Sequence, residues 1–159
     1  MFQTTRADLR FVISATLVFV LGLAVTIWDF WRIQGMIYHM GAVNVVGLIL
    51  FCVGVLIRAV GKLTLGRYYA YGLRTLPDHK LIKHGIYKYI RHPISLAGIL
   101  YIVGIPLIFS SRYGFVIMLA IAPLVLYRLK LEEQMLVEKF GDEYREYMKK
   151  TWKMIPFIY

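Results

Sequence analysis

Two short clusters of polar residues border apolar stretches and have the chemistry to bind a charged ligand. The first is Arg91-His92-Pro93, which comes directly before a long apolar run. Because proline is favoured in the first turn of a helix, we predict that a helix begins at Pro93. Its free backbone N–H groups and positive dipole end would lie beside Arg91 and His92, an arrangement that suits a carboxylate or a phosphate. A basic contact with lipid headgroups is the alternative interpretation.

The second cluster consists of Arg128, Glu132 and Glu133. Arg128 and Glu132 are four residues apart, so they would share one face of a helix. Together they could bind a ligand that carries both signs of charge. A surface ion pair, which would contribute little to stability, is the alternative.

Metal and soluble nucleotide sites are not indicated. The spacing of His79, His84 and His92 fits no helical ligand pair, and the single cysteine, Cys52, cannot complete a zinc site. The sequence also lacks a G-x-G-x-x-G fingerprint after a strand and a Walker lysine loop. We therefore predict no metal.

The elements that must position these clusters are membrane helices. Hydrophobic residues make up 59% of the 159 residues and the mean hydropathy is +0.62, which is unusual for a soluble domain. Four apolar runs with few or no charged residues predict spans at about residues 11–28, 40–60, 94–111 and 113–128. The fourth run is short and would need the long stem of Arg128 to reach the interface. Gly47, Gly54 and Gly61 lie seven apart and predict a face where another helix packs closely.

The positive charges predict the orientation. Of the 19 Lys and Arg residues, only Arg32 and Arg112 lie in the loops after the first and third spans. The positive-inside rule then places both termini, the segment 62–93 and the tail 129–159 in the cytoplasm. This topology accounts for the net charge of +10, so nucleic acid binding is not predicted.

The predicted fold is thus an all-α integral membrane bundle that forms a single domain over residues 1–159. We expect four transmembrane helices, or five if a span kinked at Pro106 or Pro123 divides in two. An amphipathic cytoplasmic helix is expected to continue the fourth span through Tyr147. The last residues, from Trp152, are expected to fold back against the membrane surface.

At this level of detail the chain resembles a known enzyme group. The stretches LIKHGIYKYIRHPISLAG and EEQMLVEKFGDEYREYMKK resemble the integral-membrane methyltransferases of the isoprenylcysteine carboxyl methyltransferase and phospholipid methyltransferase group. The group pattern is roughly L-V-x-x-G-x-Y-x-x-x-R-H-P-x-Y-x-G, then E-E-x-x-L and F-G-x-x-Y-x-x-Y. One departure is Ser95, where the pattern has tyrosine.

The resemblance implies S-adenosylmethionine as methyl donor, with S-adenosylhomocysteine as product. Arg128 would bind the acceptor, and both Arg128 and Arg91 would be catalytic. The implied cofactor-binding residues are His79, Lys80, Leu81, Ile82, Tyr87, His92, Pro93, Ile94, Ser95 and Glu132.

The acceptor that the resemblance favours is the C-terminal carboxylate of a prenylated cysteine, which would be methylated on oxygen. A phospholipid amine is an alternative acceptor. Two further interpretations stay open: an NADPH-dependent reductase of the membrane sterol type, and a small basic scaffold without enzymatic activity. The expected partners are a lipidic substrate and membrane lipid.

Overall fold

Most of the described part of the chain is helical. The structure is a computed structural model that describes residues 6–34, 40–68 and 81–155. The helices are α1 (Arg6–Gln34), α2 (Ala42–Leu65), α3 (Pro93–Ile108), α4 (Arg112–Leu119), α5 (Ile121–Phe140) and α6 (Asp142–Lys150), with short 3-10 turns at Gly66–Tyr68 and Gly85–Lys88. These residues form no strand, and one isolated parallel bridge joins Ile90 to Trp152. The predicted all-α class is confirmed.

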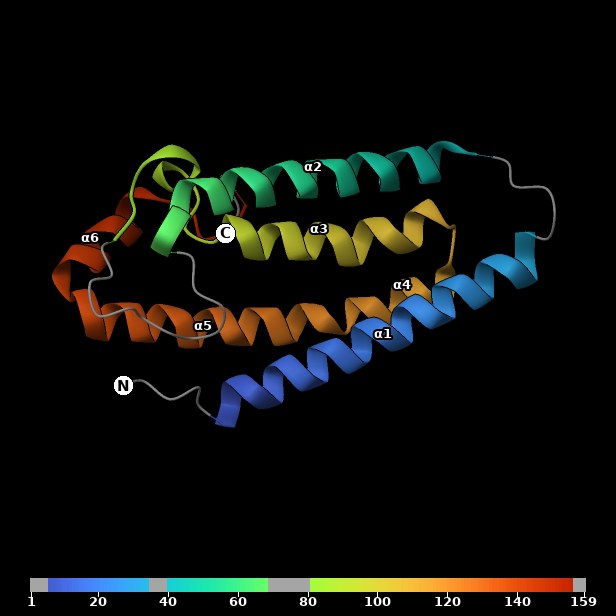
Figure 1. Cartoon of the computed structure of the whole chain (residues 1–159), viewed down its shortest axis with the longest axis horizontal. Helices are drawn as coiled ribbons and strands as arrows, with labels where there is room; N and C mark the ends of the chain where they lie inside the picture. Colours follow the sequence, from blue (N-terminus) through green and yellow to red (C-terminus); the bar gives the residue numbers. More distant parts are fainter. Residues whose placement is uncertain (1–5, 35–39, 69–80, 156–159) are drawn as a thin grey trace.

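The long helices run side by side along the molecule (Figure 1). Helix α2 packs along α3, and α1 packs mainly along α4 and also contacts α5, which continues α4 almost in line. The start of α1, the end of α2, the start of α3 and the whole of α6 lie toward one end, on the left of Figure 1. Both polar clusters of the sequence therefore lie at the same end of the bundle.

Three helical segments are long and apolar enough to cross a membrane: Leu9–Arg32, Ala42–Leu65 and Arg112–Phe140. Helix α3 is apolar but shorter. Large apolar side chains such as Leu17, Leu56 and Val116 are well exposed, as expected for helices that face lipid. The prediction of a multi-pass, helical membrane protein is confirmed at this level.

Two helix ends differ from the predicted spans. Helix α3 ends at Ile108 rather than near residue 111, because Ser110 has a positive φ of 51° and Ser111 already caps α4. The predicted fourth span is divided at Ala120 into α4 and α5. Pro123 lies three residues further on, where it has no N–H to bond the carbonyl of Leu119, so an unbroken helix is disfavoured there.

The tail is also divided. We expected one helix from the fourth span through Tyr147, but α5 ends at Phe140 and α6 begins at Asp142. Gly141 lies between them with a φ of 57°, and its N–H donates to the carbonyl of Val137 at 2.8 Å. Because residues with a side chain rarely adopt this conformation, glycine allows the chain to turn here. The turn directs α6 back toward the start of α3.

The packing of α2 on α3 depends on the three predicted glycines. Gly47, Gly54 and Gly61 are all buried. A Cβ atom at Gly47 would lie 2.6 Å from the backbone nitrogen of Ile108 and 2.9 Å from the carbonyl oxygen of Gly104. The two backbones are therefore too close for any side chain at this position. The prediction that another helix packs on this face is confirmed.

Replacing Gly47 with alanine is expected to destabilise the bundle by at least about 1–3 kcal/mol, because the backbone of α3 cannot move aside as a flexible side chain would. The matched control is Gly98→Ala in α3, where an added Cβ meets no described atom within 4 Å. That control is expected to be neutral or slightly stabilising, since alanine is the better helix former. Thermal unfolding of both variants in detergent checks this, and equal melting temperatures would contradict it.

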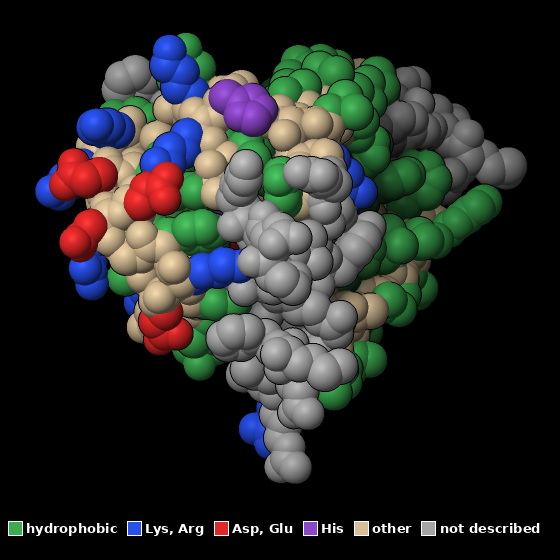
Figure 2. All heavy atoms as spheres, turned by 60° about the vertical axis from the view of Figure 1, so that its left-hand side comes forward, with side chains coloured by type: hydrophobic (Ala, Val, Ile, Leu, Met, Phe, Trp, Pro, Cys, Tyr) green, Lys and Arg blue, Asp and Glu red, His purple; other side chains and the backbone are tan. Residues whose placement is uncertain are grey.

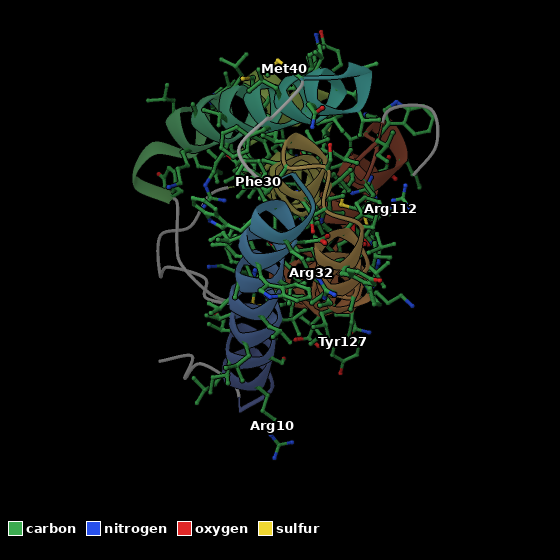
Figure 3. The ribbon with its side chains drawn as sticks, turned by 90° about the vertical axis from the view of Figure 1, so that its right-hand side faces the viewer. Arg10, Phe30, Arg32, Met40, Arg112 and Tyr127 are labelled. Atoms are coloured by element: carbon green, nitrogen blue, oxygen red, sulfur yellow. The ribbon has the colours of Figure 1, made fainter. Side chains whose placement is uncertain are left out.

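Buried polar contacts join α1 to the start of α4 at the opposite end of the bundle. The hydroxyl of Ser111 donates to Oδ2 of Asp29 at 2.8 Å and accepts from the N–H of Gly114 at 3.0 Å. Asp29 is 1% exposed. Figure 3 faces this end and labels Phe30 and Arg32 of α1 and Arg112 at the start of α4. These contacts fix α1 against α4 and so help to place it beside α5.

Candidate functional site

The candidate site forms where the loop before α3 meets the end of α5 and the chain after α6. As predicted, α3 begins at Pro93, and His92 is its N-cap residue. In the first turn of α3, the N–H of Leu96 donates to the carbonyl of His92 at 3.1 Å. Proline has no N–H, so the N–H groups of Ile94 and Ser95 are the ones that a helix leaves free for a ligand at this position.

The chain after α6 runs beside this loop. We call residues 151–154 the C-terminal strap. The N–H of Arg91 donates to the carbonyl of Trp152 at 2.9 Å, that of His92 donates to Lys153 at 3.0 Å, and that of Trp152 donates to Tyr89 at 2.9 Å. Met154, in the strap, is 3% exposed. The strap therefore fixes the backbone that carries the Arg91-His92 cluster. Residues 156–159, the rest of the segment that we expected to fold back against the membrane surface, lie outside the described residues.

One carboxylate lies at the centre of the side-chain contacts. Nε of Arg91 donates to Oε1 of Glu133 at 3.1 Å, and Nε2 of His92 lies 3.4 Å from the same oxygen. Nζ of Lys153 lies 2.8 Å from the other oxygen, Oε2. All four side chains are at most 15% exposed. Figure 2 brings this end of the molecule forward and shows acidic and basic side chains beside one another on its surface, whereas the four side chains in contact at Glu133 are largely buried.

Glu132, the neighbour of Glu133, is positioned differently. Its Oε1 lies 3.7 Å from Nδ1 of His92, which is an ionic contact longer than a good hydrogen bond. A third of its side chain is exposed, against 15% for Glu133. The two predicted clusters therefore converge at His92 and Glu132, and Glu132 has the more exposed side chain of the two glutamates.

The guanidinium of Arg91 forms its hydrogen bonds with other residues of the protein. Besides Glu133, its Nη1 donates to the carbonyl of Met148 at 3.1 Å and to the carbonyl of Thr151. Its side chain is 10% exposed. This geometry favours a role in holding the tail, while the predicted catalytic role of Arg91 stays a prediction.

Arg128 lies further along α5 and contacts α1. The Cζ atom of its guanidinium lies 5.0 Å from the centroid of the Phe11 ring, a cation–π distance. Arg128 is half-buried. Phe11 could not be selected from sequence alone, because its contact with Arg128 depends on how α1 packs against α5.

The remaining predicted residues lie around this centre. Leu81 and Ile82 are half-buried ahead of the turn Gly85–Lys88, and Tyr87 within that turn is buried. Pro93 is buried and Ile94 and Ser95 are half-buried in the first turn of α3. His79 and Lys80 lie outside the described residues.

Two tyrosines of α6 pack against the loop before α3. In the sequence they stood out only as part of the family pattern. The hydroxyl of Tyr147 donates to the carbonyl of Tyr87 at 2.6 Å, and its ring packs 5.8 Å from that of Tyr144. Burial raises the pKa of Tyr147 to about 12, and burial together with the nearby Glu133 carboxylate raises that of Tyr144 further. Both hydroxyls stay protonated at neutral pH, so neither residue acts as a base. Tyr147 donates a hydrogen bond, whereas the buried hydroxyl of Tyr144 has no hydrogen-bond partner among the described residues.

Comparisons with known proteins identify the family of the chain. Residues 46–138 match the isoprenylcysteine carboxyl methyltransferase (ICMT) family. A probable protein-S-isoprenylcysteine O-methyltransferase of Oryza sativa subsp. indica is 33% identical over 123 residues, which cover 73% of this chain and 62% of the relative. The protein-S-isoprenylcysteine O-methyltransferase of Saccharomyces cerevisiae is 32% identical over 118 residues, which cover 72% of this chain and 49% of the relative.

A solved structure has the same fold. It is that of the eukaryotic intramembrane Ras methyltransferase ICMT, and it superimposes with a TM-score of 0.68 at 23% identity, covering 99% of this chain and 55% of that chain. The chain thus spans about half to three fifths of the length of these relatives. Since the family match covers more than half of its residues, the chain belongs to the isoprenylcysteine carboxyl methyltransferase family.

Proposed function

We propose that this protein is an S-adenosylmethionine-dependent methyltransferase that methylates the C-terminal carboxylate of a prenylated cysteine. Family membership and the names of the relatives support the reaction class. The observation that carries the proposal is the convergence of His92 and Glu132, 3.7 Å apart, at the free N-terminus of α3. In this proposal, a site for an anionic group lies beside a site for a cationic one.

The residues present fit the donor. S-adenosylmethionine has a carboxylate, an ammonium and a sulfonium. The N–H groups of Ile94 and Ser95, at the positive end of the α3 dipole, suit its carboxylate. Glu132, whose side chain is a third exposed, suits a positively charged group of the same molecule. His79, Lys80, Leu81, Ile82 and Tyr87 belong to the adjoining segment that we propose surrounds the adenosyl part.

The chain has to bind and orient the reactants and exclude water. When bound, S-adenosylmethionine supplies a methyl group on a positively charged sulfur. One oxygen of the acceptor carboxylate would take this methyl group, and the carbon–sulfur bond would break to leave a neutral thioether. A carboxylate is already ionised near neutral pH, so no residue has to remove a proton. Arg128 would orient that carboxylate, and the ring of Phe11 beside it would contact the apolar part of the acceptor.

The proposed topology has four membrane spans. Beside the three long apolar segments, helix α3 would be the additional span, although its 16 residues reach only about 24 Å, which a membrane accommodates by local thinning. The excess of Lys and Arg at the end of the bundle that carries the site would place that end and both termini in the cytoplasm.

The contacts of Glu133 favour a carboxylate acceptor over a phospholipid amine. An amine must lose a proton before or during methylation, so it needs a base. Glu133 is already bound by Arg91, His92 and Lys153, and such a carboxylate is a poor proton acceptor. With an amine acceptor, Glu132 would have to act as the base and also bind the cationic group of S-adenosylmethionine.

The deciding experiment measures transfer of labelled methyl from S-adenosylmethionine by the purified chain in lipid nanodiscs. The acceptors are N-acetyl-S-farnesylcysteine, the same compound without the farnesyl group, and phosphatidylethanolamine. We expect label only in the farnesylated compound, as a methyl ester that base hydrolyses. Equal transfer to the unprenylated acceptor, or label in base-stable N-methyl groups, would replace the proposed acceptor. Binding of NADPH in place of S-adenosylhomocysteine would instead identify a reductase.

A further inference from the structure

We propose that Glu133 is a positioning residue that docks the C-terminal strap onto the loop before α3 and thereby orients His92 for the donor. The inference rests on the proposed function and deepens it. It assigns a role to Glu133, Lys153 and the strap, none of which is among the donor-binding residues proposed above.

The contacts of Glu133 join three parts of the chain. Glu133 itself lies on α5, Arg91 and His92 lie in the loop before α3, and Lys153 lies in the strap. The two carboxylate oxygens divide these partners, since Oε1 contacts Arg91 and His92 and Oε2 contacts Lys153. A single carboxylate therefore connects the strap to the loop.

The same carboxylate fixes the ring of His92. Nε2 of the ring lies 3.4 Å from Glu133, and Nδ1 lies 3.7 Å from Glu132 on the other side. The ring is 4% exposed. Because Glu133 contacts Nε2, the opposite edge of the ring must point toward Glu132, where the donor is proposed to bind. Glu133 thus determines which nitrogen of His92 is presented to the ligand.

The backbone of His92 is held by the strap as well. Its N–H donates to the carbonyl of Lys153 at 3.0 Å, so that the strap residue that binds Glu133 by its side chain also binds His92 by its carbonyl. Release of Lys153 from Glu133 is therefore expected to loosen both the backbone and the ring of His92. The free N–H groups of the first turn of α3 follow directly after this residue.

The experiment is a double-mutant cycle on binding. Glu133→Gln keeps the shape of the side chain but removes its charge, and Lys153→Met removes the strap cation. Each variant is expected to weaken S-adenosylhomocysteine binding by about tenfold or more, as one lost charge-assisted hydrogen bond does. If Glu133 acts through the strap, the double variant binds about as weakly as either single variant.

The matched controls are Glu146→Gln and Lys149→Met, which break an ion pair of 2.6 Å on the exposed face of α6. Both side chains of this pair are more than half exposed, so binding is expected to stay unchanged. The second readout is hydrogen exchange at the amides of His92 and Trp152, which donate to the strap and to the loop respectively. A merely stabilising role would lower the melting temperature and leave both the dissociation constant and this protection unchanged.

Three outcomes are decisive. Folded Glu133→Gln protein that binds S-adenosylhomocysteine within about twofold of the parent overturns the inference. Additive losses in the double variant also overturn it, because the two residues then act independently. If the parent binds S-adenosylhomocysteine but methylates no prenylated acceptor, the proposed acceptor fails, while the coupling between Glu133 and Lys153 still decides the inference.

Discussion

Replacing Arg91 with alanine is expected to abolish measurable methyl transfer and to release the C-terminal strap from the loop before α3. The guanidinium donates from Nε to Glu133 and from Nη1 to the carbonyls of Met148 and Thr151. Removing one partner of a buried ion pair costs about 3–5 kcal/mol. This corresponds to a loss of at least about 100-fold in the equilibrium constant for docking of the strap. Arg91→Lys is expected to lose most of the activity too, because one ammonium cannot reproduce the planar fork that joins a carboxylate to two carbonyls.

Limited proteolysis and hydrogen exchange after residue 150 measure the release of the strap, and methyl transfer is measured on the same samples. The matched control is Arg145→Ala on α6, whose ion pair with Asp142 is largely exposed and contributes little. A strap that stays protected in an inactive Arg91→Ala protein would contradict a holding role. That result would instead support the direct catalytic role that the sequence suggested for Arg91.

The start of α3 and the packing of α2 could be predicted because both depend on local signals. Proline fixes its own φ, so Pro93 marks the first turn of a helix wherever that helix packs. Glycines at a repeat of seven lie on one face of a helix whatever its partner, and Gly47 indeed lies against the backbone of α3. In the same way, the distribution of positive charges along the sequence was enough to predict that the two polar clusters lie at the same end of the bundle.

The difference in burial and contacts between the two glutamates could not be predicted. Glu132 and Glu133 are neighbours in sequence, and the pattern E-E treats them alike. Which of them is buried depends on the rotation of α5 and on the strap, and Lys153 comes twenty residues later. The contact of Arg128 with Phe11 depends in the same way on tertiary packing between α5 and α1.

Two helix breaks carried local signals, of which we used the second, at Pro123, and overlooked the first, at Gly141. Gly141 follows directly after an amphipathic stretch, where a glycine commonly ends a helix. Pro123 was expected to kink or divide its span, and the division occurs three residues earlier at Ala120. The break at Gly141 matters for the site, because without it α6 could not bring the hydroxyl of Tyr147 to the carbonyl of Tyr87.

Replacing Glu132 with glutamine is expected to weaken the binding of S-adenosylhomocysteine while leaving the fold intact. Glu132 is a third exposed and makes only a 3.7 Å contact with His92, so the protein loses little when its charge is removed. A ligand that carries an ammonium would lose a charge-assisted hydrogen bond, which contributes about 1.5–3 kcal/mol, or roughly 10-fold to 150-fold in affinity. The change should therefore appear in the dissociation constant and hardly in the melting temperature.

Calorimetric titration with S-adenosylhomocysteine in detergent measures this effect, with Glu138→Gln as the control on the exposed face of the same helix. The comparison with Glu133→Gln is the informative one, because that substitution should alter protection of the strap as well as affinity, whereas Glu132→Gln should alter affinity alone. Unchanged binding by Glu132→Gln would mean that the donor's cationic group binds elsewhere. The convergence of His92 and Glu132 would then be a structural ion pair, and the binding site would have to be sought away from the N-terminus of α3.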